Sequence, residues 1–191
     1  MFNSTTARQQ AIQTARKVLE VKPVYLDTET TGLNRSDEIV EITIVDSEGQ
    51  VLVDSFVRPS QPIPLDATRI NNITNEMVQG APTWPILWVQ QIRPILTGKV
   101  IVAYNTEFDL RMMQQSHDRY RLPWRESLHS YDLLKLYAQF RGVWDPARKS
   151  WKFYTLEEAG TASAISLPNA HRALADTLLA RELLLYIAGA S

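Results

Sequence analysis

One stretch near the N-terminus constrains the fold more than any other, residues 24–32, with the sequence VYLDTETTG. It begins as an apolar, partly β-branched run, which is typical of a strand buried on both faces of a sheet. Side chains two positions apart in a strand point to the same face, so Asp27 and Glu29 project together where this strand ends. Gly32 then permits the chain to turn away sharply.

The two carboxylates require a partner. Like charges side by side repel each other and resist desolvation, so a cation must neutralise them or one of them must hold a proton. Oxygen ligands of this kind suit Mg²⁺ or Mn²⁺ better than Zn²⁺. These residues alone leave two interpretations open, a metal site or a polar strand end that leads into a turn.

Length and composition indicate one domain with a core of ordinary size. The chain has 191 residues, 45% of them apolar and 21% charged, which argues against disorder. We predict a single domain over residues 1–191, with residues 1–21 as a helical extension that packs on it. The sequence has no cysteine, no signal peptide in its first 20 residues and no apolar run near the ~20 residues of a membrane span. We therefore expect a cytoplasmic protein with no membrane partner.

The net charge of −1 argues against a generally basic nucleic-acid binder, but the charge is unevenly distributed. Residues 110–152 contain nine Lys/Arg and four Asp/Glu, a local charge of +5, and the remainder holds eleven basic and seventeen acidic residues, a charge of −6. A basic strip beside an acidic pocket is what a metal-using enzyme acting on a polyanion needs. An uneven but solvated surface is the alternative interpretation.

Periodicity and turn residues predict an α/β chain. Residues 38–45 alternate polar and apolar side chains, as in a half-exposed strand, and a turn separates them from a further strand at 51–57. Three consecutive strands at short spacing predict an antiparallel meander in a mixed sheet. Further strands are expected at 100–103 and 127–131, helices at 5–20, 74–79, 83–96, after 105, 132–140, 155–161 and 171–187, extended chain at 58–64 and a loop at 142–152.

Two later acids occupy unusual positions. Asp109 has Met112 and Met113 at i+3 and i+4, so it lies toward the apolar face of its helix, although a capping box with Thr106 is an alternative explanation.

Asp176 lies within the apolar stripe of the last predicted helix, which is formed by Ala173, Ala180, Leu183, Leu184 and Ile187. A buried carboxylate there would cost several kcal/mol without a partner. Arg172, at i−4, is the local cation that could pair with it. His171 lies about 140° from Asp176 on an ideal helix, so both share a pocket only if His171 belongs to the frayed helix start.

Together these residues resemble the DEDDh superfamily of 3′→5′ exonucleases, which includes the proofreading subunits of bacterial replicative polymerases. The first motif is similar to residues 27–33 (DTETTGL), the second to residues 105–109 (NTEFD) and the third to His171 and Asp176 with their spacing. Secondary matches occur at 73–78, 131–134 and 154–157, so the similarity spans roughly residues 22–188 in the family's order. The resemblance implies one exonuclease domain with a ribonuclease H-like fold, a mixed sheet of about five strands flanked by helices.

The resemblance also implies a mechanism. Asp27, Glu29, Asp109 and Asp176 would hold two Mg²⁺ or Mn²⁺ ions, and His171 would be the general base that takes the proton of the attacking water. The reaction would release nucleoside 5′-monophosphates from the 3′ end of single-stranded DNA or RNA.

The substrate contacts implied by the resemblance are Thr30, Leu33, Met77, Asn105 and Phe108, with Leu33 and Met77 at positions where relatives hold the terminal base. For these two side chains, ordinary packing is the alternative.

The chain departs from the family pattern in a few places. Tyr104 stands where many relatives have histidine, and Asn71-Asn72 replaces the more usual His-Gly. The N-terminal helix and residues 142–152 resemble additions. The second of these combines Trp144 and Trp151 with Arg148 and other cations, a composition that suits a single strand because bases stack on aromatic rings. We predict that Trp144 and Arg148 contact substrate, with a loop that covers the core as the alternative.

A different class of function also fits the fold, a non-catalytic module for nucleic-acid binding or protein interaction. Loss of a ligand or of the histidine would favour it, and the sequence retains all of them. The residues do not distinguish DNA from RNA, a monomer from an oligomer, or a free enzyme from one attached to a polymerase or another nucleic-acid enzyme.

Overall fold

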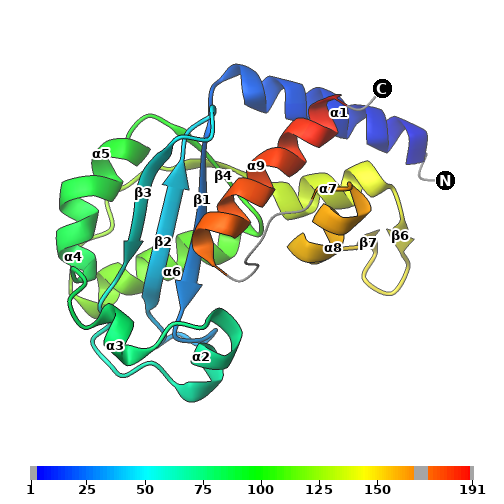
Figure 1. Cartoon of the computed structure of the whole chain (residues 1–191). Coiled ribbons are helices and arrows are strands. Elements are labelled where there is room, and N and C mark those ends of the chain that lie inside the picture. The colour runs from blue at the N-terminus through cyan, green and yellow to red at the C-terminus, as the bar shows by residue number, and fades with distance from the viewer. Residues whose placement is uncertain (1–3, 166–171, 190–191) are drawn as a thin grey trace.

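The computed structural model describes residues 4–165 and 172–189. Its centre is a sheet of five strands in the order β3-β2-β1-β4-β5 (Figure 1). β1, β2 and β3 form an antiparallel meander, whereas β4 runs parallel to β1 and β5 runs parallel to β4. The predicted α/β fold with a mixed five-stranded sheet is therefore confirmed. The strands span Val24–Thr30 (β1), Ile39–Val45 (β2), Val51–Phe56 (β3), Val100–Ala103 (β4) and His129–Asp132 (β5).

Helices cover both faces of this sheet. The long ones are Ser4–Glu20 (α1), Thr106–Arg119 (α6), Leu133–Arg141 (α7) and Ala173–Gly189 (α9). Short ones are Leu65–Asn71 (α2), Asn75–Val78 (α3), Trp84–Leu87 (α4), Arg93–Leu96 (α5) and Leu156–Ala162 (α8), and a π-helical turn, η1 (Trp88–Ile92), joins α4 to α5. Among the described residues, no helix combines the length and apolar character of a membrane span.

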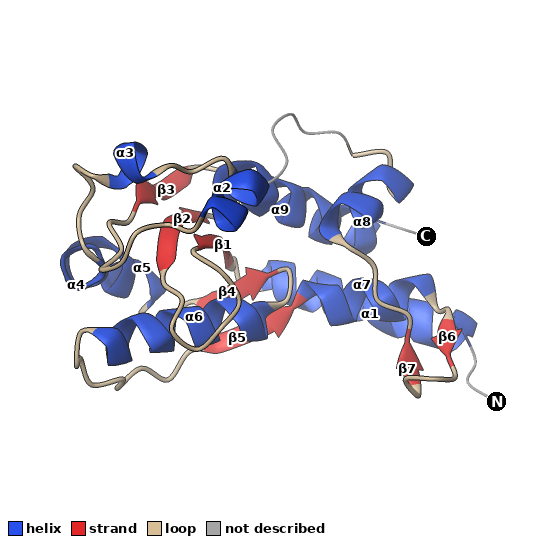
Figure 2. Ribbon diagram, turned by 90° about the horizontal axis from the view of Figure 1, so that it is seen from below, coloured by secondary structure: helices blue, strands red, loops and turns tan. Residues whose placement is uncertain are grey.

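β1 is buried because each of its faces meets a different helical layer (Figure 2). Tyr25 packs into a core shared with α1, α7 and α9. Val24 and Leu26 point the other way, into a second core with α6 and residues 84–96. Because side chains alternate along a strand, Asp27 and Glu29 belong to the α9 side and Thr28 to the α6 side.

β2 differs from its prediction, since every residue from Ile39 to Val45 is buried. Its polar side chains have partners on neighbouring elements. Glu41 pairs with Arg172, and Thr43 donates a hydrogen bond to Asp54 at 2.8 Å. The polar–apolar alternation was read as half-exposure, but it reflects a strand whose polar side chains are satisfied inside the protein.

The predicted helix at 83–96 exists, but a π-helical turn interrupts it. Pro94 lies at the start of α5 and has no backbone N–H to donate, so the regular hydrogen-bond ladder cannot continue through it.

α2 was missed, because Leu65 and Ile70 are exposed and only Ala67 and Asn71 are buried, which leaves no amphipathic pattern. Asn72 ends α2 with φ of 59°, so it occupies the left-handed position that the more usual glycine fits.

Residues 142–152 form a small hairpin rather than the predicted loop. Its strands, Trp144–Asp145 (β6) and Ser150–Trp151 (β7), pair Trp144 with Trp151. The two rings meet edge to face at 5.5 Å, a contact that favours the paired strands despite their shortness. Both views place the hairpin at the C-terminal end of α7, away from the main sheet (Figures 1 and 2).

Candidate active site

The first candidate motif lies where β1 leaves the sheet. β1 pairs with β4 only at Val24 and Tyr25, and β4 ends at Ala103, so Asp27 extends past the end of β4. A bulge in the β1–β2 pairing follows Glu29. The space beyond the end of β4 lets carboxylates from other elements approach β1.

Gly32 is required by the turn after β1. A Cβ atom there would lie 2.6 Å from Oδ2 of Asp37. Asp37 cannot easily move, because it accepts hydrogen bonds from the hydroxyl of Thr31 at 3.0 Å and the N–H of Asn34 at 2.6 Å. The glycine of the motif therefore has a steric explanation.

α9 brings Asp176 to the same place. One carboxylate oxygen each of Asp27, Glu29 and Asp176 lie within 4.8 Å of one another, a spacing that fits shared coordination of a metal ion. Asp176 belongs to the first turn of α9, which packs across β1 and β2. The apolar stripe predicted for this helix is buried, namely Ala173, Ala180, Leu183, Leu184 and Ile187.

Asp109 reaches the site from the opposite face of the sheet. Only 2% of its surface is exposed, and it accepts a hydrogen bond from the Thr28 hydroxyl at 2.8 Å. The hydroxyl of Thr106 donates instead to the carbonyls of Ala103 and Tyr131. The capping-box explanation for Asp109 is therefore wrong, and its carboxylate faces β1.

These carboxylates resist ionisation in the metal-free protein. Burial, followed by the charges of Asp109 and Glu29, raises the pKa of Asp27 well above its usual value. Burial, followed by Asp176, raises the pKa of Glu29 to about 7. Burial raises the pKa of Asp109 to about 7 despite the hydrogen bond from Thr28. The cluster therefore favours either bound protons or bound cations at neutral pH.

Several site residues were not predicted from the sequence. Glu41 lies directly opposite Glu29 in the β1–β2 pairing, is 3% exposed and forms an ion pair with Arg172. Asn71 donates to the Thr30 carbonyl at 3.2 Å, and its hydrogen bond with Glu29 lowers the pKa of that carboxyl against the larger effect of burial. No sequence signal indicates a role for Glu41, because its strand is predicted to be half-exposed and its partner is 131 residues away.

The residues predicted to contact substrate differ in their exposure and in their partners. Leu33 is 75% exposed on the turn after β1, and Met77 is exposed on α3. Phe108 lies half-buried beneath the guanidinium of Arg111, 5.2 Å from its ring centre. The Thr30 hydroxyl donates to the Gly32 carbonyl at 2.8 Å and so stabilises the turn.

The remaining predicted site residues lie on other elements. Asn105 is exposed at the start of α6 with φ of 70°. Trp144 and Arg148 belong to the hairpin beside α7. This hairpin carries none of the four carboxylates, which come from β1, α6 and α9. His171 lies outside the described residues, between residue 165 and Arg172.

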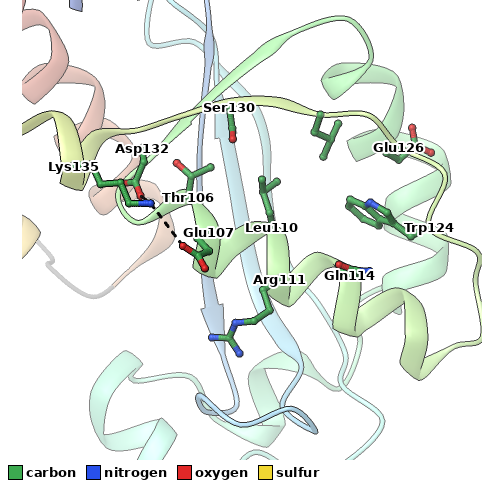
Figure 3. Close-up of a pocket in the computed structure, with 11 residues that line it drawn as sticks. Thr106, Glu107, Leu110, Arg111, Gln114, Trp124, Glu126, Ser130, Asp132 and Lys135 are labelled. Carbon is green, nitrogen blue, oxygen red and sulfur yellow. Dashed lines mark ion pairs between the residues drawn. The ribbon is translucent and has the colours of Figure 1, made fainter. Parts of the chain in front are cut away.

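A pocket of about 630 Å³ lies on the outer side of α6, between that helix and β5 (Figure 3). Nζ of Lys135, which lines this pocket, lies 3.7 Å from a carboxylate oxygen of Glu107 and 3.4 Å from one of Asp132, so both of these acids already have a cationic partner. None of the clustered carboxylates lines it. The carboxylate cluster, not this pocket, is therefore the candidate active site.

Known proteins share both the sequence pattern and the fold. The family model described as exonuclease, RNase_T, matches residues 24–184. An uncharacterized exonuclease, CP81, of Escherichia phage 186 is 38% identical over 171 residues, which cover 86% of this chain and 87% of that protein. The DNA polymerase III subunit epsilon of Treponema pallidum is 29% identical and covers 82% of this chain and 72% of its own length.

Solved structures of exonucleases share the fold of this chain. Exonuclease X, in complex with 5′-overhanging duplex DNA, superposes with a TM-score of 0.65 at 26% identity over 86% of this chain and 89% of its own. Escherichia coli exonuclease I, in complex with a dA16 oligonucleotide, superposes with a TM-score of 0.71 over 88% of this chain and 41% of its own, and at 19% identity it shows the shared fold alone. On the family match and the phage relative together, this chain belongs to the RNase_T family of exonucleases, the DEDDh group.

Proposed function

We propose that this protein is a metal-dependent exonuclease that shortens single-stranded nucleic acid from the 3′ end and releases nucleoside 5′-monophosphates. The observation that carries the proposal is the convergence of Asp27, Glu29 and Asp176 within 4.8 Å, with Asp109 held beside them through Thr28. Such a set of oxygen ligands with raised pKa values suits two divalent cations, Mg²⁺ or Mn²⁺.

Each part of the site has a distinct task in the reaction. Asp27 and Glu29 from β1, Asp109 from α6 and Asp176 from α9 would hold the two ions, which when bound would activate water and stabilise the departing 3′ oxygen. His171 would accept the proton of the attacking water, a task that suits histidine because its imidazole ordinarily changes charge near neutral pH.

Apolar and amide side chains outside the carboxylate cluster would contact the end of the strand. Leu33 and Met77 expose large side chains that would hold the terminal base. Asn105 and Phe108, at the start of α6, would lie along the strand that leaves the carboxylates. Thr30 would act through the turn that it stabilises and on which Leu33 stands.

The hairpin of residues 143–152 would bind the strand farther from the cut. Tyr104, beside Asn105 at the start of α6, donates a hydrogen bond to the Tyr154 carbonyl at 2.8 Å, which links the start of α6 to the segment after the hairpin. Arg148 and Trp144 belong to that hairpin. A strand that follows this link would meet cations and aromatic rings suited to phosphates and bases.

The relatives support DNA as the first substrate to test and a polymerase as the first partner. Two of the structural neighbours were solved with DNA, and one relative is a DNA polymerase III subunit epsilon. RNA remains a substrate class for the same chemistry.

The decisive experiment uses 5′-labelled single-stranded DNA, duplex DNA and RNA with Mg²⁺, Mn²⁺ or EDTA. We expect a ladder that shortens one nucleotide at a time from the 3′ end, only with metal. Degradation in EDTA would contradict the metal requirement, and release of the 5′ label as a mononucleotide would contradict the polarity. Binding of oligonucleotide without any cleavage would favour a non-catalytic module.

A further inference from the structure

Glu41 and Arg172 form an ion pair directly beneath the carboxylate cluster. Glu41 is opposite Glu29 in the sheet, and Arg172 immediately precedes α9. The guanidinium uses two nitrogens: Nη2 donates to one carboxylate oxygen of Glu41, and Nε lies 3.1 Å from the other. This is the bidentate geometry that only arginine provides.

The same carboxylate also caps the start of α9. Glu41 accepts a hydrogen bond from the Ala173 N–H at 3.1 Å, one of the donors that a helix start leaves unsatisfied. The first helical turn closes with an i→i−4 hydrogen bond, in which the Asp176 N–H donates to the Arg172 carbonyl at 3.1 Å. The Glu41 side chain of β2 is therefore connected through Arg172 and Ala173, at the start of α9, to the backbone of Asp176.

We propose that Glu41 and Arg172 are a positioning pair that fixes the first turn of α9 on β2 and so places Asp176 against Asp27 and Glu29. The inference rests on the proposed function, since it assigns the pair to the same metal site. The pair lies outside the set of four carboxylates, and it acts through Asp176 rather than on the substrate.

Charge alone does not explain this arrangement. Arg172 is a cation near a cation site, so by Coulomb repulsion it disfavours metal, and its removal should strengthen binding if position were unimportant. Arg172 does lower the pKa of Glu29, although burial and the charge of Asp176 have larger, opposite effects. The two explanations therefore predict changes of opposite sign in metal affinity.

The protein contains a matched control pair. Glu38, the residue before β2, is 4% exposed, and Nε of Arg119 at the end of α6 lies 3.7 Å from its Oε1. Like Arg172, this arginine joins a helix to a glutamate at the β2 side of the sheet, but it lies at the end of α6, far from the first turn that carries Asp109. Arg119→Gln should therefore lower stability without changing the metal site.

The test is isothermal titration of the full chain with Mn²⁺ at pH 7.5, with melting temperature as a measure of stability. Loss of an outer partner of metal ligands typically weakens metal binding about 10–100-fold, and we expect that range for Arg172→Gln. Arg172→Lys keeps the positive charge but cannot form the two parallel hydrogen bonds of the guanidinium. Its Mn²⁺ affinity should therefore stay within about threefold of that of Arg172→Gln.

A further variant addresses folding, because Arg172→Gln leaves a buried carboxylate without its partner. The double variant Glu41→Gln with Arg172→Gln leaves no charge there, and we expect it to fold with Mn²⁺ affinity still reduced about tenfold. Wild-type affinity in the double variant or in Arg172→Lys would overturn the inference. An equal loss in Arg119→Gln would also overturn it, because general loosening would then suffice.

The same titration separates this inference from the proposed function. If the wild-type protein bound no Mn²⁺ at millimolar concentration, the proposed function itself would fail. If the wild type bound Mn²⁺ and Arg172→Gln bound it as tightly or more tightly, only the positioning pair would be rejected.

Discussion

At the scale of single residues, the carboxylates oppose the stability of the metal-free protein. Asp176→Ala removes one negative charge from a repelling cluster, so the melting temperature in EDTA should stay the same or rise. Exonuclease activity should fall by roughly 100-fold or more, since metal binding is lost. Glu107→Ala is the control, because that acid is exposed on α6 close to Asp109. A large stability loss in the metal-free Asp176 variant would contradict the repulsion.

The raised pKa values predict an unusual pH dependence of stability. Glu29 and Asp109 titrate near 7 in the folded state and near 4 when unfolded. Between these values the folded protein holds more protons, so its stability falls as pH rises from about 4 to 7. In EDTA the melting temperature should therefore be higher at pH 5.5 than at pH 8. Thermal unfolding followed by fluorescence measures this difference. A higher melting temperature at pH 8 would mean that the site does not hold these protons.

His171 has a prediction of its own, since its role comes from the resemblance. His171→Ala should lower kcat by roughly 10²–10⁴, the usual cost of losing a general base. Mn²⁺ affinity should change little, because histidine is not among the proposed ligands. A variant within a few-fold of the wild type between pH 6 and 9 would exclude this role.

At the scale of elements, variants of the hairpin can distinguish a role in substrate binding from a purely structural role. Arg148→Ala should raise KM for long oligonucleotides more than for dinucleotides and leave kcat nearly unchanged, because the contact is equal in the ground and transition states. Asp145→Asn is the matched control. It removes the partner of Arg148, which lies 3.8 Å away, and keeps an oxygen for the Ala147 N–H. If both variants raised KM alike, the ion pair would serve the hairpin's own structure.

Trp144→Ala completes this comparison. The ring packs edge to face on Trp151, so its loss should both weaken the hairpin and remove a stacking surface worth ~1–3 kcal/mol per base. Trp151→Ala removes the same contact between the rings. A KM increase confined to the Trp144 variant would assign that ring to the substrate.

At the scale of the whole molecule, the metal should act as part of the fold. α9, α6 and β1 come from three regions of the chain and meet at carboxylates that repel one another. A cation that binds only the folded state stabilises it by mass action, about 2.7 kcal/mol at 100 times Kd. For a chain of this size that corresponds to a rise in melting temperature of roughly 5–10 °C with Mn²⁺ at pH 8. No rise in the wild type would count against the metal site.

The sequence by itself determined the local features of this protein. The buried strand that ends in Asp27 and Glu29 follows from composition and from the two-residue period of a strand. The meander, the start of a helix at Asp132 and the short helix from Thr155 are local as well, and the structure contains all three. The order of the motifs was enough to indicate the family.

Tertiary structure alone decided how those features meet. Thr28 and Asp109 are 81 residues apart, and Glu41 and Arg172 are 131 apart, so no local pattern could reveal either contact. The burial of Glu41 in β2 follows from the second contact, because its charge is paired with an arginine from another region of the chain. The periodicity of a strand or helix predicts which face a residue occupies. Only the packing of one element on another decides what that face contacts, and therefore which charged side chain is neutralised.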